Sequence, residues 1–472
     1  MTWYYILLLA AYVGTIISMV AVVVSENRNP VKSLAWITVL LMVPVFGAVL
    51  YVFFGRSLKN VHVITRRNRR RLRKRETFRK VEIDKIPFSR QCVQQVKLAH
   101  TLSGAIYYPG NNIEIFTKGG DKFSALEQDL LRAKDYIHLQ YYIFEDDNVG
   151  NRISDILIAK ARQGVKVRVI YDHVGSIHAS NKFFKRMTEA GVMIYPFLRV
   201  TFRAFATHIN WRNHRKLAII DGKVGYIGGM NIADRYIDGG RFECWRDTHL
   251  RIRGAAVGAL QYSFAADWNF MGQPVLEEST EQTFAFEPQS DAGVQMLTSG
   301  PTSQWSNIAM VFQKAITGAS KCVYIQTPYF LPPEALLKAL QSVALSKVDV
   351  RIMMPKESDS ALMRYASFSY IQECLRAGIK IYLYEKGMLH SKVLIVDDEF
   401  VSVGSTNFDF RSFECNFESN VFIYSRDVNK RMRDIFITDI KDCERITISR
   451  WRHRPPIKKM HESMARMLSP IL

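Results

Sequence analysis

Histidine, lysine and aspartate recur in this 472-residue chain with a single spacing, H-x-K-x-x-x-x-D. The two copies consist of His214, Lys216 and Asp221, and of His390, Lys392 and Asp397. Each copy runs on into a turn that contains glycine and asparagine, at 228–231 and at 404–407. A single match to so short a pattern carries little weight in a long chain. Two copies with matching turns indicate a duplicated site.

Apolar and β-branched residues separate the lysine from the aspartate in each copy, which predicts a strand. Side chains two residues apart on a strand point to the same face, so His214 and Lys216 would act together. Asp221 is an odd number of residues from His214, so on a strand it would point to the other face. It also opens an Asp-Gly turn, which predicts a hairpin. We therefore expect Asp221 and Asp397 to have structural roles, and the histidines and lysines to carry the chemistry.

Two imidazoles and two ammonium groups suit a phosphodiester, provided that the two copies face each other across one cavity. Displacement at phosphorus needs a nucleophile, an acid for the leaving oxygen, and fixed positive charge on the other oxygens. His214 as nucleophile would form a phosphohistidine, and His390 would protonate the leaving alkoxide and then deprotonate the incoming alcohol. The side chains expected to hold the phosphate are those of Asn231, Ser405 and Asn407.

Each imidazole needs a partner on its second nitrogen to orient it. We expect Glu418, eleven residues after Asn407, to orient His390. Asp247 and Glu243 are the candidates for His214, and Asp247 is favoured because it enters an apparent strand. No cluster of histidine, cysteine and aspartate has metal-ligand spacing. We therefore expect no metal and no cofactor, with the lysines supplying the positive charge.

Strand-like segments recur in pairs through the rest of the chain, at 136–144 and 322–330, at 165–171 and 348–354, and at 191–195 and 378–382. Amphipathic segments such as 154–163 and 333–344 lie between them. This alternation predicts an α/β fold in which mixed sheets are flanked by helices. We expect two homologous halves, 109–290 and 291–472, related by a pseudo-twofold axis, with the acidic stretch 277–291 as their seam.

The first 56 residues contain two uncharged runs, 1–25 and 33–55. Each run is long enough to cross roughly 30 Å of hydrocarbon. A cleaved signal peptide is a poorer explanation, because the first run lacks a basic start and a second apolar run follows at once. We predict a transmembrane hairpin over 1–56, followed by a basic juxtamembrane linker over 57–108. The arginine-rich stretch 66–75 would keep the catalytic body in the cytoplasm and attract anionic lipid.

The net charge of +20, from 64 basic and 44 acidic residues, calls for an anionic partner, which is nucleic acid or an anionic membrane. An apolar content of 48% excludes a disordered chain. Six cysteines without a C-x-x-C pair indicate reduced thiols. The long connection 198–213 is expected to hang over the site or touch the bilayer. The C-terminal segment 455–468 has apolar and basic faces, and either lies on the bilayer or packs as a terminal helix.

Two H-x-K-x-x-x-x-D motifs on a duplicated α/β fold are the signature of the phospholipase D superfamily, which this chain resembles. More narrowly, it resembles the bacterial cardiolipin synthases over nearly its whole length. The segments that carry this narrower resemblance are the apolar hairpin with its turn at 27–30, and the stretches 140–144, 213–216, 228–231 and 326–330.

The resemblance implies phosphatidyl transfer between two phosphatidylglycerol molecules, which gives cardiolipin and glycerol without a metal at the bacterial inner membrane. It implies that both complete motifs are catalytic, with His214 as the nucleophile and His390 as the acid and base. The chain departs from internal symmetry at one position, because Gly229 stands where the second copy has Ser405. The first half-site therefore lacks a hydroxyl donor.

Other functions share these motifs. The same site could use water, as a phospholipase does, or another alcohol as acceptor. A nuclease is disfavoured by the two apolar runs, so we expect no nucleic-acid partner. A catalytically inactive scaffold that binds anionic lipid through 66–75 would have no need for two histidine-lysine pairs.

Overall fold

The computed structural model describes residues 83–199, 211–276, 290–467 and 469, together with short groups of residues between 3 and 68. Helix α2 (Pro30–Met42) belongs to this N-terminal part. Within the described residues, none of the helices combines the length and the apolar character that a bilayer crossing requires. Four predicted segments lie wholly or largely outside the described residues: the transmembrane hairpin 1–56, the arginine-rich stretch 66–75, the connection 198–213 and the seam 277–291.

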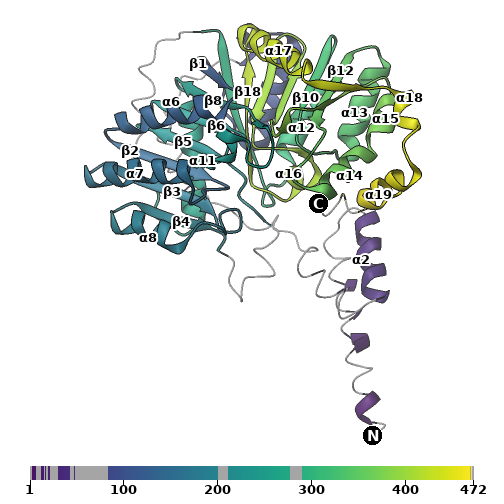
Figure 1. Ribbon diagram of the computed structural model, residues 1–472, viewed down its shortest axis with the longest axis horizontal. Helices are drawn as coiled ribbons and strands as arrows, with labels where there is room; N and C mark the ends of the chain where they lie inside the picture. The colour runs from purple at the N-terminus through teal and green to yellow at the C-terminus, as the bar shows by residue number, and fades with distance from the viewer. Residues whose placement is uncertain are drawn as a thin grey trace.

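Strands from both halves build the body of the protein (Figure 1). The first half contributes β1 (Tyr108–Phe116), β2 (Tyr136–Tyr141), β3 (Lys166–Asp172), β4 (Met193–Phe197), β5 (Leu217–Ile220), β6 (Val224–Gly228) and β8 (His249–Arg253). The second half contributes β9 (Ala292–Ser299), β10 (Cys322–Gln326), β12 (Asp349–Pro355), β13 (Lys380–Tyr384), β15 (Val393–Val396), β16 (Phe400–Gly404), β18 (Glu418–Tyr424) and β19 (Cys443–Ile446).

These strands form one mixed sheet in the order β19-β13-β12-β10-β15-β16-β18-β9-β1-β8-β6-β5-β2-β3-β4. Strands β2, β3 and β4 run parallel, as do β10, β12 and β13, which confirms the three predicted strand pairs. The β-hairpin predicted at Asp221 is present, since β5 pairs with β6 in antiparallel register. The predicted mixed sheets are continuous, because antiparallel pairing of β1 with β9 joins the strands of the two halves into one sheet.

Helices cover the two faces of the sheet differently. On one face, α11 (Val257–Phe270) and α17 (Arg426–Ile440) pack over a core shared by strands of both halves. On the other face each half has its own core. The first half uses α6 (Gly119–Arg132), α7 (Asn148–Arg162) and α8 (Asn181–Glu189), and the second uses α12 (Asn307–Thr317), α13 (Glu334–Leu345), α14 (Ala361–Ser369) and α15 (Ile371–Arg376).

Helix α5 (Arg90–Ser103) lies within the stretch expected to be a linker, yet it belongs to the body. Its Val96 and Ala99 are fully buried in the core of the second half. The Gln295 side chain on β9 also donates to the backbone carbonyl oxygen of Val96, at 3.2 Å. The segment that precedes the first half in the sequence therefore packs against the second half.

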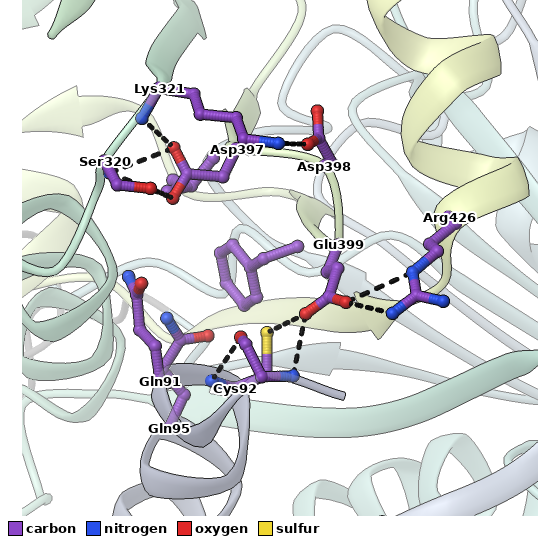
Figure 2. Close-up of a pocket in the computed structure, with 12 residues that line it drawn as sticks. Gln91, Cys92, Gln95, Ser320, Lys321, Asp397, Asp398, Glu399 and Arg426 are labelled. Carbon is purple, nitrogen blue, oxygen red and sulfur yellow. Dashed lines mark hydrogen bonds and ion pairs between the residues drawn. The ribbon is translucent and has the colours of Figure 1, made fainter. Parts of the chain in front are cut away.

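The two motif aspartates tie the start of a neighbouring strand to the hairpin. The carboxylate of Asp221 accepts the backbone N–H groups of Lys134, Asp135 and Tyr136 at 2.8–2.9 Å, where β2 begins. In the second half Asp397 accepts the backbone N–H groups of Ser320, Lys321 and Cys322 at the start of β10, and Figure 2 shows the first two of these contacts. Both aspartates have positive φ, 51° and 50°, as the tight turn requires.

Replacing Asp221 with alanine is expected to lower the free energy of unfolding by about 1–3 kcal/mol, because three backbone N–H groups lose a buried acceptor. Urea unfolding followed by circular dichroism measures this loss. The matched control is Asp135→Ala at the same strand end, where the side chain is exposed; its effect should stay within about 0.5 kcal/mol. Equal stability of the two variants would contradict the structural role of Asp221.

Candidate active site

Each histidine is held in place by the main chain of the other half. The backbone N–H of His214 donates to the carbonyl oxygen of Phe417 at 2.9 Å, and the N–H of Phe417 donates back to Arg212 at 2.9 Å. In the same manner the N–H of His390 donates to the carbonyl oxygen of Arg246 at 2.7 Å. Just before His390, β14 (Gly387–Leu389) pairs in parallel with β7 (Cys244–Arg246) of the first half. The two half-sites are therefore assembled by backbone hydrogen bonds between the halves.

The carboxylates that orient the histidines also cross from one half to the other. Glu418 lies 3.0 Å from Nδ1 of His214, and Asp247 lies 2.8 Å from Nδ1 of His390. The predicted pairing within each half was therefore wrong, because each of the two acids lies beside the histidine of the other half. The physical reason is that Glu418 directly follows Phe417 and Asp247 directly follows Arg246. The remaining candidate, Glu243, is exposed.

The two lysines are buried beneath the histidines. Lys216 donates to the carbonyl oxygen of His214, and Lys392 donates to that of His390. Burial lowers the pKa of Lys216 well below its usual value, although the Glu418 carboxylate opposes this. Burial likewise lowers the pKa of Lys392 to about 8, with Asp247 acting in the opposite direction. The carboxylates from the opposite half thus oppose the loss of charge that burial favours at both lysines.

Burial keeps both imidazoles neutral. It lowers the pKa of His214 to about 4, against the attraction of Glu418. Burial and the neighbouring Lys392 lower the pKa of His390 as well. Nδ1 of His390 lies close to both Asp247 and Lys392, and of these only the carboxylate can accept a ring proton. Nδ1 of His214 lies 3.0 Å from Glu418 and 3.0 Å from the carbonyl oxygen of Ser405, and both are acceptors. With Nδ1–H donated on that side, each ring keeps the lone pair on Nε2 for chemistry.

Both carboxylates are ionised despite their burial, which by itself raises a carboxyl pKa. The attraction of His214 and Lys216 and the hydroxyl of Ser405 hold the pKa of Glu418 below its usual value. Lys392 and His390 do the same for Asp247. The ionised carboxylates can therefore accept hydrogen bonds from the ring N–H groups over the physiological pH range.

His214 and His390 line one cavity of about 410 Å³, which confirms the expectation that the two copies face a common space. We call it the central cavity. Three arginines and four aromatic side chains also line it: Arg212, Arg235 and Arg411, and Tyr142, Tyr236, Trp245 and Tyr329. Asp221 and Asp397 are not among its lining residues. Their hydrogen bonds hold strand ends together, so their place among the catalytic residues is not supported by the geometry.

Sequence reasoning missed the arginines. Arg212 stands two residues before the first motif and Arg411 four residues after Asn407. This nearness to the motifs was a signal that could have suggested both. Arg212 lies 3.2 Å from the buried carboxylate of Asp172, and Arg235 lies 2.9 Å from Glu145. These ion pairs fix the guanidinium groups at the wall of the central cavity.

The two asparagines line the central cavity as expected. Asn231 accepts the backbone N–H of Ile143 at 3.1 Å and donates to the Tyr236 hydroxyl at 2.7 Å, so one of its amide hydrogens is left for a ligand. Within the described part of the chain, Oδ1 of Asn407 is buried and has no hydrogen-bond partner. This free acceptor of Asn407 suits a ligand hydroxyl, whereas an anionic oxygen would need the N–H groups of the amide.

Ser405 does not line the central cavity, so its predicted phosphate contact is replaced by another role. Its hydroxyl donates to the carboxylate of Glu418. Gly229 occupies the equivalent position in the first half, and a Cβ there would lie 2.1 Å from Oδ1 of Asp247. The departure from symmetry therefore reflects how each acid is packed: Glu418 rests on a hydroxyl, whereas Asp247 fills the space that a side chain would need.

Comparison with known proteins identifies the family. A family model described as "Cardiolipin synthase, PLD-like domain" matches residues 126–268 and 312–440. The major cardiolipin synthase ClsA of Bacillus subtilis (strain 168) is 39% identical over 478 residues, which cover 99% of this chain and 99% of that protein. This chain belongs to the cardiolipin synthase family. The family assignment confirms the resemblance drawn from the two motifs.

Other matches agree with membership of the cardiolipin synthase family. A cardiolipin synthase of Listeria monocytogenes (serotype 4b, strain F2365) is 39% identical over 457 residues, covering 95% of each chain. A model described as "Phospholipase_D-nuclease N-terminal" matches residues 10–56. The crystal structure of phosphatidylserine synthase from Haemophilus influenzae Rd KW20 aligns with a TM-score of 0.61 at 14% identity, over 80% of this chain and 100% of that chain. The last match shows a shared fold.

The crossed pairing predicts how the ring protons respond to substitution. Glu418→Gln should lower the pKa of His214 further and move its Nδ1–H proton resonance upfield, because an attracting carboxylate is lost. His390 should be unaffected by this variant, and Asp247→Asn should have the converse effect. NMR of protein labelled with ¹⁵N-histidine measures both rings. A change at His390 in the Glu418 variant, with none at His214, would contradict the crossed pairing and support pairing within each half.

Proposed function

We propose that this chain is a cardiolipin synthase, which transfers the phosphatidyl group of one phosphatidylglycerol to the glycerol headgroup of a second and releases glycerol. The observation that carries the proposal is that two imidazoles, each backed by a carboxylate from the other half, line one cavity. The identity of 39% to cardiolipin synthases over nearly the whole chain supports the choice of substrate.

In the first step Nε2 of His214 donates its electron pair to phosphorus. A phosphorus–nitrogen bond forms as the bond to the headgroup oxygen breaks, and protonated His390 transfers its proton to that oxygen, so that glycerol leaves. This step needs the imidazolium form of His390, whose pKa burial and Lys392 lower in the free protein. A bound phosphate raises that pKa, because an anion favours the charged ring.

In the second step neutral His390 takes the proton of the incoming headgroup hydroxyl. The alkoxide oxygen bonds to phosphorus as the phosphorus–nitrogen bond breaks, and the lone pair returns to His214. Splitting one transfer into two replaces a difficult displacement with two easier ones. His390 ends the cycle protonated and ready for the next donor lipid.

The remaining polar groups have electrostatic and positioning roles in this proposal. Lys216 and Lys392, which are buried and do not line the central cavity, supply positive charge to the site without a metal or another cofactor. The amide N–H groups of Asn231 and Asn407 donate to the non-bridging oxygens of the phosphate. Glu418 orients His214 and stabilises it when it carries the phosphoryl group, and Asp247 does the same for His390 as it gains and loses its proton.

The N-terminal part would keep the enzyme beside its lipids. We propose that 1–56 forms a transmembrane hairpin in the bacterial inner membrane and that the catalytic body lies in the cytoplasm. The two uncharged runs, the basic stretch 66–75 and the match of residues 10–56 to the N-terminal family model support this arrangement. An anionic membrane that contains phosphatidylglycerol and cardiolipin is then the physical partner of the +20 chain.

Purified full-length protein supplied with phosphatidylglycerol alone is expected to release glycerol and cardiolipin in equal amounts, and His214→Ala should lower the rate by roughly 10⁴-fold or more because the nucleophile is lost. The variant should still associate with membranes. Acid quenching should trap labelled phosphatidyl-enzyme in the wild type and none in His214→Ala. Phosphatidic acid as the main product would show a hydrolase, and no turnover in the wild type would favour the lipid-binding scaffold.

A further inference from the structure

The C-terminal helix α19 (Pro456–Met467) presents an apolar stripe to solvent. The side chains that form it are Ile457, Met460, Met464 and Met467, which are 56%, 50%, 59% and 81% exposed. Their spacing of three, four and three residues places them along one face of the helix. Glu462 and Ala465, on the opposite face, are 5% and 4% exposed. We call these four exposed residues the apolar stripe.

Specific contacts hold α19 on the body with the apolar stripe facing outward. The helix packs on α14. Arg454 reaches Glu462 at 2.9 Å, and Arg466 reaches Glu373 of α15 at 2.6 Å. The guanidinium of Arg466 also lies 4.3 Å from the centre of the Tyr370 ring. The orientation of the apolar stripe is thus set by ion pairs and ring contacts on the buried side.

A single helix, α14, connects α19 to the wall of the central cavity. Asp359 and Met363 line that cavity, and Met363 belongs to α14, the helix on which α19 packs. Leu362, next to Met363 on α14, is apolar and 42% exposed. A surface that engages the stripe would therefore be one helix away from the cavity wall.

The charge around the apolar stripe indicates what covers it. Between Arg450 and Met467 the chain has six basic residues and one acidic residue. The acidic residue, Glu462, is buried against Arg454, whereas Lys458 and Arg452 are exposed. A helix with an exposed apolar face and basic flanks suits the boundary between the headgroups and acyl chains of an anionic bilayer. Figure 1 also shows α2 extending from the end of the body at which α19 lies.

We propose that α19 lies on the surface of an anionic bilayer with its apolar stripe inserted among the acyl chains, and so holds the entrance of the central cavity at the level of the lipid headgroups. This contact is additional to the N-terminal hairpin. It rests on the proposed function in one respect, namely that the lipid of the bilayer is also the substrate. Lipids could enter the central cavity from this surface without leaving the bilayer completely.

The test uses full-length protein in nanodiscs of phosphatidylglycerol and phosphatidylcholine that carry one copy each. Peroxide oxidises exposed methionines, so mass spectrometry reports whether Met460 and Met467 are covered. In Met464→Glu, a charge in the middle of the stripe should lift the helix from the lipid and speed oxidation of both neighbours about tenfold. Leu345→Glu on α13 is the matched control, since Leu345 is 64% exposed and Met464 is 59% exposed.

A second readout compares turnover of phosphatidylglycerol in the bilayer with turnover of a short-chain, monomeric form in water. Met464→Glu should lower only the bilayer rate, and Leu345→Glu should lower neither. Oxidation rates that are equal in the wild type and Met464→Glu would overturn the proposal. Protection that arises only in discs with two copies would assign the stripe to a second copy and also overturn it. If the wild type turns over neither substrate, the proposed function fails, and the oxidation rates still decide the role of α19.

Discussion

The exchange of carboxylates between the two halves is the constraint on which the site depends. Glu418 of the second half orients His214 of the first, and Asp247 of the first half orients His390 of the second. The backbone bond that positions each histidine ends on the residue just before its carboxylate, Phe417 or Arg246. Position and protonation of a ring are therefore set by one short segment of the other half. Neither half contains a complete acid–base pair.

This arrangement also explains how so many ionisable groups tolerate burial. A buried charge is costly unless a partner of opposite sign and hydrogen bonds accompany it. Each half-site contains one lysine, one neutral histidine and one carboxylate, so the two half-sites together are close to electrically neutral when empty. An anionic phosphate then enters a site whose lysine and carboxylate charges already compensate each other, while the ring Nδ1–H groups stay on the carboxylates. The single sheet and the core shared by both halves hold these six groups in register.

Local pattern was enough to predict the strands and the hairpin at Asp221. The expectation that histidine and lysine share a face of a strand did not hold, because both pairs precede their strands, β5 and β15. The partners of the histidines were beyond such reasoning. Assigning Glu418 and not Asp247 to His214 requires knowing which segment of the other half lies beside this histidine. The pattern of residues along the sequence does not contain that information. The role of Ser405 was missed for the same reason, since its hydroxyl is directed at Glu418 and away from the cavity. The joining of β1 to β9 depends likewise on pairing between distant segments.

The most direct test of the account is a structure of the full-length protein with orthovanadate, which adopts the five-coordinate geometry of displacement at phosphorus. The account predicts one vanadium in the central cavity, with Nε2 of His214 on one side and Nε2 of His390 on the other. The ring Nδ1 atoms should remain on Glu418 and Asp247, respectively. Vanadate bound to a single histidine, or two vanadates in separate cavities, would contradict the claim that both halves act on one phosphorus.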